Sequence, residues 1–277
     1  MKKICIMGMG YIGLPTAALL ANRGYLTHGV DVNQYTIDTI NLGKIHIVEP
    51  ELEDFVYAAV RSNTLTVNME PVEADIFMIA VPTPFYSNRL NKITNSPMPN
   101  VDYVISATKK IAPYIRPGNL VLLESTSPVG TTDMIADILK EEGVDINSIS
   151  IAHSPERVLP GCIMRELIEN DRVVGGINKP STRAAAEFYR TFVKGEVLET
   201  TAKTAEMTKL TENSFRDVNI AFANELSMLC DDIDIDIGEL ISLANRHPRV
   251  SILSPGCGVG GHCISVDPWF IVDSANG

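Results

Sequence analysis

Short apolar and β-branched runs alternate, along roughly the first 200 residues, with longer stretches whose apolar positions recur every three or four residues. The short runs predict strands, and the longer stretches predict helices with one buried face. The predicted strands cover residues 3–8, 26–31, 65–68, 76–81, 119–125, 148–154, 172–176 and 196–201. The predicted helices cover residues 11–23, 33–42, 50–61, 101–111, 131–142 and 182–193. Strands and helices that alternate in this way favour an α/β fold with a doubly wound, mainly parallel sheet.

The pattern changes to helix after residue 201. Residues 202–232 predict one continuous helix of roughly 45 Å, and residues 236–246 predict a second helix. A helix of that length is more often a spine between domains or a dimer interface than a surface decoration. We therefore predict one domain over residues 1–200 and an α-helical central domain over residues 201–277. The Pro-, Asn- and Ser-rich segment 82–100 predicts a loop over a site.

Composition narrows the functional classes. Lys and Arg number 23 against 34 Asp and Glu, and this net charge of −11 argues against a nucleic-acid or anionic-membrane partner. The start of the chain superficially resembles a secretory signal, but three glycines interrupt its apolar run and an acid follows it. No other segment has the length of uncharged apolar sequence that a membrane span needs. Five cysteines without a tight, even spacing suit a reducing compartment, so we expect a cytoplasmic protein.

The first predicted strand leads directly into a glycine turn. Gly8, Gly10 and Gly13 form a GxGxxG sequence that opens the first helix, and Asp31 closes the second strand. In a dinucleotide-binding (Rossmann-type) fold the glycines let the backbone approach a pyrophosphate, and the acid accepts hydrogen bonds from ribose hydroxyls. Asp31 favours NAD over NADP because a 2′-phosphate would face a carboxylate. The alternative is a structural glycine turn that binds no dinucleotide.

Two further loops leave predicted strand ends, where ligands of such sheets bind. They are residues 80–84 and residues 124–130, and each carries a threonine, Thr83 and Thr126, whose hydroxyl could meet a cofactor or substrate oxygen. The alternative is turn chemistry, in which Pro and Ser or Thr merely end strands and cap helices. For Thr126 the two interpretations are evenly balanced.

The long predicted helix carries a polar stripe. Glu206, Lys209, Asn213 and Arg216 follow one another at intervals of three or four and therefore share one helical face. A solvated polar face is the ordinary explanation of such a stripe. Asn is nevertheless a mediocre helix former, and a Lys with an Asn one turn away can hold a developing alkoxide.

Residues 254–270 contain four glycines and two cysteines, and Cys263 is the one whose role is in question. A disulfide with Cys257 is disfavoured in a reducing compartment, and the spacing of Cys257, His262 and Cys263 does not suit zinc, so we predict no metal site. A packed small thiol is the serious alternative. A cysteine on an open glycine loop, with Asp267 four residues further on, also fits a thiolate nucleophile.

Together these motifs resemble the UDP-sugar 6-dehydrogenases, which oxidise the primary alcohol of a sugar to a carboxylate with two NAD. The resemblance covers essentially the whole chain. It rests on segments 8–14, 81–84, 154–157, 205–209 with Asn213, 224–225, and 260–263 with Asp267. Segments 45–50, 155–161 and 245–250, and the residues around 262–270, match one branch of the family.

The resemblance implies a role for individual residues. Cys263 would be the nucleophile and Lys209 the proton donor or acceptor, with Asn213 and a Lys209-linked water holding the oxyanion. Asp267 would help to activate water. The implied catalytic residues are Cys263, Lys209, Asn213, Asp267, Glu156 and Thr126. The implied cofactor-binding residues are Gly8, Gly10, Tyr11, Ile12, Gly13, Asp31, Val81, Pro82, Thr83 and Thr126. The implied UDP-sugar-binding residues are Arg157, Val158, Lys209, Asn213, Arg216, His247, Arg249 and Gly260.

The resemblance also implies a homodimer through helix 202–232, with His247 and Arg249 reaching into a partner's site. Two features depart from the family pattern. Cys257 replaces a proline in a turn, and family members continue beyond residue 277 into a UDP-binding domain, so we expect that domain to be absent. The alternatives are a sibling that oxidises another UDP-sugar, a single-hydride 3-hydroxyacid dehydrogenase, and an inactive NAD-binding or dimerisation fragment.

Overall fold

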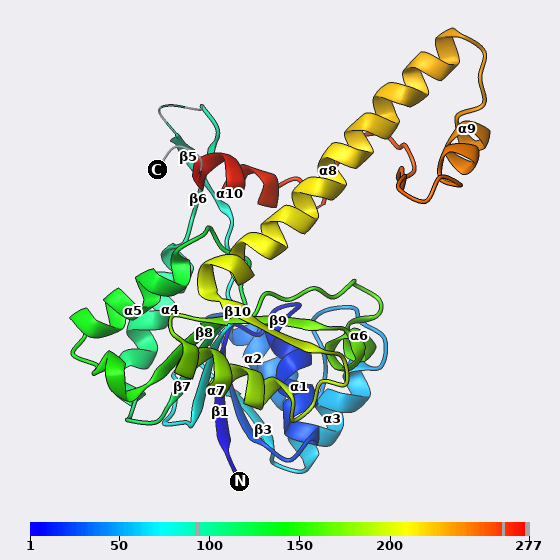
Figure 1. Cartoon of the computed structure of the whole chain (residues 1–277). Helices are drawn as coiled ribbons and strands as arrows, with labels where there is room; N and C mark the ends of the chain where they lie inside the picture. Colours follow the sequence, from blue (N-terminus) through cyan, green and yellow to red (C-terminus); the bar gives the residue numbers. More distant parts are fainter. Residues whose placement is uncertain (92, 94, 262–263, 275–277) are drawn as a thin grey trace. The chain divides into compact units, whose positions relative to one another are not determined.

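The computed structural model of the chain describes residues 1–91, 93, 95–261 and 264–274. The chain forms two compact units (Figure 1). The sheet unit comprises residues 1–84 and 100–206, and the helical unit comprises residues 85–99 and those from 207 onward. Each unit is described by itself.

An eight-stranded sheet organises the sheet unit, as the sequence predicts. Its strands are β1 (Lys3–Met7), β2 (Leu26–Val30), β3 (Leu65–Asn68), β4 (Ile76–Ile79), β7 (Leu120–Leu123), β8 (Ser150–His153), β9 (Arg172–Gly176) and β10 (Val197–Thr201). They lie in the order β10-β9-β8-β7-β4-β1-β2-β3. The β8–β9 pair is antiparallel and the other six pairs are parallel, so the predicted α/β, mainly parallel, doubly wound fold is confirmed.

Alternate side chains of the central strands enter two separate cores. In β1, Ile4 and Ile6 join one apolar cluster, whereas Cys5 and Met7 join the other. This period of two is what a strand buried on both faces requires, and it explains the almost unbroken apolar runs in the sequence. The cores position the carboxyl ends of the strands, where the candidate site residues lie.

Helices cover both faces of the sheet. The helices are α1 (Gly13–Asn22), α2 (Gln34–Asn41), α3 (Leu52–Arg61), α4 (Asp102–Ile111), α5 (Thr131–Glu141), α6 (Ile163–Glu169) and α7 (Lys179–Tyr189), with 3-10 turns at Ala112–Tyr114 and Ile146–Ser148. Figure 1 shows α4 and α5 together on one side, where they close one core, and α1, α3 and α6 on the other.

Among its described residues, the helical unit contains a small antiparallel pair, β5 (Phe85–Leu90) and β6 (Pro97–Pro99), and three helices. The helices are α8 (Ala202–Asp232), whose first turn belongs to the sheet unit, α9 (Ile237–Ala244) and α10 (Asp267–Ser274). The ring of Phe270 on α10 meets that of Phe85 edge-on at 5.9 Å. The segment that follows α9 is tied to α8, because Asn219 donates to the carbonyl of Ser251 at 2.8 Å and accepts from the N–H of Leu253 at 2.9 Å.

Several local predictions differ from the structure. The segment 82–100 is not wholly irregular, since it contains β5 and β6. Helix α7 begins and ends three to four residues earlier than predicted, because Asn178 caps it by accepting from the N–H of Ser181. Helices α6 and α10 were not predicted. Across the described part of the chain, no helix combines the length and apolarity needed to cross a bilayer.

Candidate active site

The glycine turn between β1 and α1 is shaped by close backbone packing. Gly8 has φ +94°, and a Cβ there would lie 2.6 Å from the carbonyl oxygen of Ala80. A Cβ on Gly13 would lie 1.8 Å from the carbonyl oxygen of Gly8. A Cβ on Gly10 would meet nothing within 4 Å. Gly8 and Gly13 are therefore required by the fold itself, whereas Gly10 faces open space that a ligand could use.

Asp31 follows β2 and lies against this turn. One carboxylate oxygen accepts from the N–H of Met9 at 2.9 Å, and the other accepts from the N–H of Asn33 at 2.9 Å. The carboxylate is only partly buried, so its remaining lone pairs can accept from ligand hydroxyls. The N-cap of α1, Ile12, has no side-chain cap, which leaves backbone donors at that helix end. Open glycine, helix end and acid together fit a dinucleotide.

The loops after β4 and β7 are tied to each other. The hydroxyl of Thr83 donates to the carbonyl of Thr126 at 2.6 Å, and the hydroxyl of Ser125 donates to the carbonyl of Val81 at 2.7 Å. These bonds fix the spacing of two loops at the carboxyl edge of the sheet. The hydroxyl of Thr83 is thus engaged in a bond between the two loops, whereas Thr126 takes part in that bond through its backbone carbonyl.

A buried ion pair supports the loop after β8. Oε2 of Glu156 lies 2.7 Å from Nη1 of Arg172, and both side chains are at most 5% exposed. The two atoms are not aligned as a hydrogen bond, so the contact is an ion pair. Burial is the largest influence on the pKa of Arg172 and lowers it, but Glu156, Tyr189 and Glu124 together outweigh burial, so the pKa is raised. The pair fixes the direction of the Glu156 carboxylate.

Glu124, at the end of β7, is the most strongly perturbed acid beside this pair. Burial raises its pKa to about 7, and the charge of Glu156 adds to the rise, while Arg172 opposes it. Tyr189 donates its hydroxyl to Oε1 of Glu124 at 2.8 Å. Oε2 of Glu124 has no hydrogen-bond partner among the described residues. Buried groups with shifted pKa values of this kind often accompany functional sites.

In the helical unit, Asn213 of α8 and Asp267 of α10 are in direct contact. The side-chain amide of Asn213 donates to Oδ2 of Asp267 at 2.5 Å, and both residues are 4% exposed. Burial raises the pKa of Asp267, and the hydrogen bond from Asn213 and the charge of Lys209 partly offset this rise. An ammonium, an amide and a carboxylate therefore gather at one place on α8 and α10.

The polar stripe of α8 is not one uniform face. Glu206 is 1% exposed and belongs to the sheet unit, where it accepts from the N–H of Gly130 at 2.6 Å and from the N–H of Thr132 at 2.7 Å. Its carboxylate thereby provides hydrogen-bond acceptors for two backbone N–H groups at the start of α5. Arg216, one turn beyond Asn213, is exposed. The solvated-face explanation of the stripe is therefore wrong for Glu206 and Asn213, which are buried.

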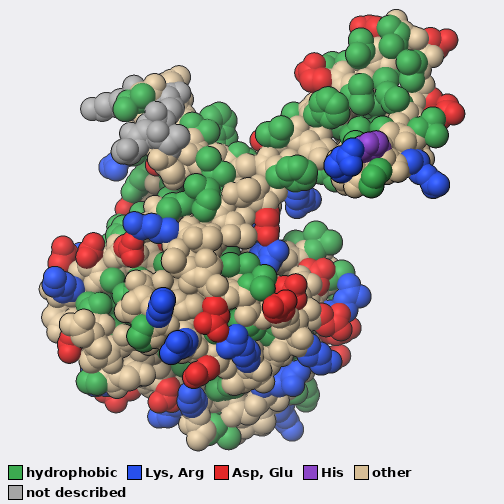
Figure 2. Space-filling model, viewed as in Figure 1, with side chains coloured by type: hydrophobic (Ala, Val, Ile, Leu, Met, Phe, Trp, Pro, Cys, Tyr) green, Lys and Arg blue, Asp and Glu red, His purple; other side chains and the backbone are tan. Residues whose placement is uncertain are grey.

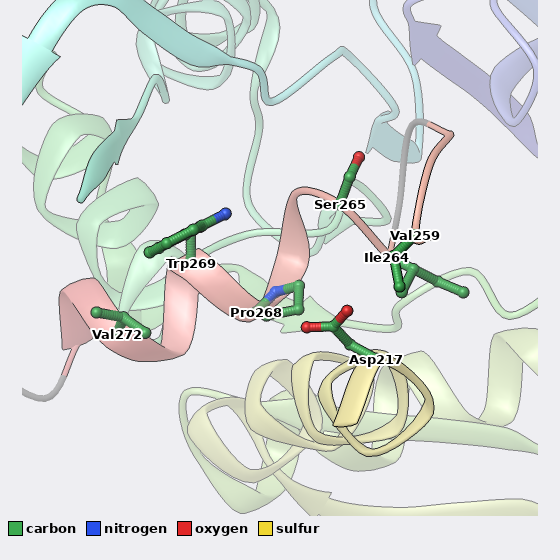
Figure 3. Close-up of a pocket in the computed structure, with 7 residues that line it drawn as sticks. All are labelled: Asp217, Val259, Ile264, Ser265, Pro268, Trp269 and Val272. Carbon is green, nitrogen blue, oxygen red and sulfur yellow. The ribbon is translucent and has the colours of Figure 1, made fainter. Parts of the chain in front are cut away.

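The glycine loop borders a hollow of about 390 Å³ within the helical unit (Figure 3). Figure 3 shows Val259, Ile264 and Ser265 of the loop beside Pro268 and Trp269 of α10 and Asp217 of α8. His262 and Cys263 lie outside the described residues. The hollow is therefore bounded by loop residues that precede and follow Cys263 in sequence.

The other predicted site residues are placed as follows. The sheet unit holds Gly8, Gly10, Tyr11, Ile12, Gly13, Asp31, Val81, Pro82, Thr83, Thr126, Glu156, Arg157 and Val158. The helical unit holds Lys209, Asn213, Arg216, His247, Arg249, Gly260 and Asp267. His247 and Arg249 are exposed neighbours, and the N–H of Arg249 donates to Nδ1 of His247 at 3.3 Å. No group of three or more His, Cys, Asp or Glu arranged to hold a metal occurs among the residues that the structure describes.

Sequence reasoning missed Glu124 and Arg172. Each is a charged residue beside or within an otherwise apolar strand, at the end of 120–123 and at the start of 172–176. A charge in such a position is costly to bury unless it is paired, and this is a usable signal in the sequence. It does not reveal which partner the charge meets.

An α/β unit with an open glycine turn beside Asp31, followed by helices that carry Lys209, Asn213 and Asp267, fits a dinucleotide-dependent dehydrogenase. Residues 2–193 match the sequence profile of the UDP-glucose/GDP-mannose dehydrogenase family, NAD binding domain, and residues 203–277 match that of its central domain. The chain belongs to the UDP-glucose/GDP-mannose dehydrogenase family.

Individual relatives agree with this assignment. The chain is 57% identical to a UDP-N-acetyl-D-mannosamine dehydrogenase of Campylobacter jejuni, over 98% of this chain and 67% of that protein. It is 54% identical to an NDP-N-acetyl-D-galactosaminuronic acid dehydrogenase of Ralstonia nicotianae, over 99% of this chain and 65% of that protein. The structure of a UDP-D-ManNAc dehydrogenase of Pyrococcus horikoshii superposes with a TM-score of 0.92 at 40% identity, over 99% of this chain and 65% of that one. The chain thus spans about two thirds of the length of these relatives.

Proposed function

We propose that this chain carries the cofactor-binding and catalytic parts of an NAD-dependent UDP-N-acetyl-D-mannosamine 6-dehydrogenase. The proposed reaction is the four-electron oxidation of the C6 alcohol to a carboxylate, which gives UDP-N-acetyl-D-mannosaminuronate. The observation that carries the proposal is that the family likeness runs through both chemical segments, the glycine turn and the stretch from Gly260 to Asp267. The proposed division into domains, 1–200 and 201–277, follows the same likeness.

NAD supplies the hydride acceptor when it is bound. The proposed binding residues are those of the glycine turn with Asp31, and the tied loops that contain residues 81–83 and Thr126. Gly10 leaves room for the pyrophosphate, and Asp31 accepts from the ribose hydroxyls. The fit rests on the open position of Gly10 and on the backbone donors at the start of α1.

The proposed chemistry begins with loss of the C6 hydroxyl proton toward Lys209 as the C6 hydride leaves, which gives an aldehyde. The Cys263 thiolate then adds to the aldehyde carbon, and the new S–C bond makes a thiohemiacetal that can lose a second hydride. Loss of that hydride gives a thioester. Asn213 and Lys209 stabilise the oxyanion at both addition stages. The contact of Asn213 with Asp267 supports this assignment, because it fixes the amide near the ammonium.

Water finally cleaves the thioester, which releases the carboxylate and restores the Cys263 thiol. We propose that Asp267 accepts a proton from this water, and that Glu156 and Thr126 assist the hydrolysis and the handling of protons. The raised pKa of the Asp267 carboxyl favours this role, since a stronger base removes a proton from water more readily. The ion pair with Arg172 holds the Glu156 carboxylate in a fixed direction for this proposed role.

UDP-N-acetyl-D-mannosamine is the proposed substrate because relatives with this name match the chain at up to 57% identity. The proposed contacts are Arg157, Val158, Lys209, Asn213, Arg216, His247, Arg249 and Gly260. A sibling activity on UDP-N-acetylglucosamine or UDP-glucose would use the same catalytic residues.

The test of the substrate assignment is the initial rate of NADH formation with each UDP-sugar at equal concentration. Preference for the mannosamine sugar supports the proposal, and preference for another sugar overturns this substrate assignment.

One observation favours a second candidate. This alternative is an NAD-binding or dimerisation module without turnover, since the NAD-binding domain profile alone spans residues 2–193. NAD binding with no NADH formed from any UDP-sugar would select this alternative.

We also propose a homodimer formed through α8. Large apolar side chains are exposed along α8 and the turn beyond it, namely Phe215, Val218, Phe222, Met228, Leu229, Ile233 and Ile235. Figure 2 shows this gathering of apolar side chains over the far part of α8 and over α9. An exposed apolar surface of this kind marks an interface more often than free surface. His247 and Arg249 lie exposed near it in sequence, and we propose that they reach the partner's site.

Light scattering tests the dimer. The native chain should have twice the mass of one chain, and Phe222→Asp should give a single-chain mass. A single-chain mass for both proteins would overturn the dimer.

The proposed location is cytoplasmic, which agrees with free thiols at Cys5, Cys162, Cys230 and Cys257. No nucleic-acid or membrane partner is proposed.

A further inference from the structure

Glu49 connects two parts of the sheet unit that lie far apart in sequence. It precedes α3, yet Oε2 accepts from the N–H of Gly161 at 2.8 Å and Oε1 accepts from the N–H of Ile163 at 2.8 Å. We propose that Glu49 is a positioning residue for the nucleotide-sugar substrate, which holds loop 157–161 in the conformation that contacts the sugar nucleotide. This inference rests on the proposed function, since Arg157 and Val158 lie on that loop.

Burial strengthens the two hydrogen bonds of Glu49 and makes their loss costly. The residue is 4% exposed, and a buried carboxylate without donors is costly. Two backbone N–H groups meet its charge, and hydrogen bonds to an ionised acceptor are stronger than neutral ones. If the loop moved away, the carboxylate would lose both of these backbone donors. The energy of Glu49 is therefore coupled to the position of the loop.

Glu49 also replaces a missing helix cap. Cys162, at the N-cap of α6, has no side-chain hydrogen bond to the helix. The first N–H groups of a helix need acceptors, and a negative charge is favourable at that end. Glu49 supplies both from another part of the chain. The start of α6 and the loop before it are thus fixed by the same carboxylate.

Further bonds complete the hold on the loop but are local. The N–H of Leu159 donates to Glu166 of α6 at 2.8 Å, and the N–H of Arg157 donates to its neighbour Glu156 at 2.7 Å. Gly161 has φ +92°, a conformation that suits glycine and lets the chain turn into α6. Of these three carboxylates, Glu49 is the one that anchors the loop to a distant segment. The Glu49 bonds instead join the loop and the start of α6 to a segment more than 100 positions earlier in the sequence.

The test compares Glu49→Gln with Asn41→Ala in the full chain. Gln keeps the size of Glu49 but turns a donor toward one backbone N–H. Asn41→Ala is the matched control, because Asn41 also makes two backbone bonds to one strand, accepting from the N–H of Val67 at 3.0 Å and donating to its carbonyl at 2.8 Å. Amide exchange of the loop 157–163 and calorimetric binding of NAD and of UDP-N-acetyl-D-mannosamine are measured for each protein.

Glu49→Gln should speed exchange in the loop about tenfold and weaken binding of the UDP-sugar about tenfold, with NAD binding changed less than about twofold, as loss of one buried charged hydrogen bond implies. Asn41→Ala should change none of these three. Unchanged loop exchange and sugar binding in Glu49→Gln overturn the inference. Equal weakening of NAD and sugar also overturns it, since that would indicate a general structural role. If the unmodified chain binds NAD but not the UDP-sugar, the proposed function fails and removes the basis of the inference.

Discussion

The side-chain amide of Asn213 on α8 donates a hydrogen bond of 2.5 Å to the buried carboxylate of Asp267, 54 residues further along the chain. This contact joins the long helix to the start of α10, and Asp267 lies four residues after Cys263 in the sequence. It commits one donor of Asn213 to Asp267, and an amide of this kind has a second N–H donor. The contact holds the carboxylate of Asp267 in place, and the charge of Lys209 also acts on that carboxylate.

The first prediction concerns this contact. Asn213→Ala removes the donor, so the buried Asp267 carboxylate loses a hydrogen bond that favours its charged form and its pKa should rise. The rate of NADH formation should fall about a hundredfold, as for the loss of an oxyanion donor, while the dissociation constant of NAD stays unchanged. Steady-state kinetics and calorimetry measure the two quantities. A rate within about threefold of the original would remove Asn213 from the proposed mechanism.

The second prediction separates the two uses of glycine in the first turn. Gly10→Ala places a methyl group in open space, so the free energy of unfolding should change by less than about 1 kcal/mol. The same methyl group should obstruct the pyrophosphate and weaken NAD binding at least about tenfold. Denaturant unfolding and calorimetry check this pair of values.

Gly13→Ala is the contrasting variant. Its Cβ would lie 1.8 Å from the carbonyl oxygen of Gly8, so the start of α1 must shift and stability should fall clearly. Normal NAD affinity in Gly10→Ala would show that the dinucleotide does not approach this turn.

The third prediction concerns pH. The pKa of Glu124 is raised to about 7 in the folded chain by burial and by Glu156, against about 4.5 when unfolded. Between these values the folded state holds the proton that the unfolded state has released, so stability should fall as pH rises from 4.5 through 7. Each pKa unit corresponds to about 1.4 kcal/mol. Glu124→Gln mimics the protonated acid and should lack this loss.

Denaturant unfolding at several pH values tests the difference between the two proteins. Burial lowers the pKa of His153 to about 3, which gives stability an opposite slope below pH 6.5. This slope is present in both proteins and cancels in their difference. Parallel stability curves for the native chain and Glu124→Gln would show that Glu124 is ionised in both states.

The central strands of the sheet could be predicted from the sequence because they are buried on both faces and form almost unbroken apolar runs. The small elements could not. In the segment 82–100, prolines and asparagines favour turns. The register of β5 and β6 also shifts between Phe85 and Leu90, so the sequence shows no regular alternation of apolar and polar residues that would predict the two strands. Helix α10 begins at Asp267 and Pro268 directly after the glycine loop, where local propensity favours irregular chain.

The candidate site was predictable where a motif has a fixed spacing, as at Gly8 to Gly13 and Asp31. Its supporting contacts were not predictable. Glu49 meets Gly161 across 112 positions, and Arg172 meets Glu156 across a strand whose antiparallel direction no local pattern indicates. Such contacts depend on how strands are ordered in the sheet, which the periodicity of one segment does not contain.

The fourth prediction concerns Glu206. Its carboxylate accepts two backbone N–H groups at the start of α5 and the hydroxyl of Thr132 at 2.6 Å. Glu206→Ala would leave these buried donors unpaired, so the free energy of unfolding should fall by about 3 kcal/mol. Glu142→Ala, an exposed acid at the other end of α5, should change it by less than about 0.5 kcal/mol. Equal stability of the two variants in denaturant would contradict the capping role.

The most direct test of the proposed function is the number of NADH molecules formed per UDP-N-acetyl-D-mannosamine consumed, measured for the chain and for Cys263→Ser. The double oxidation predicts two NADH and a uronate product for the native chain. Without the thiol, the second oxidation has no thiohemiacetal to act on, so Cys263→Ser should stop at the aldehyde. No NADH from the native chain, or two NADH per sugar from Cys263→Ser, would contradict the account.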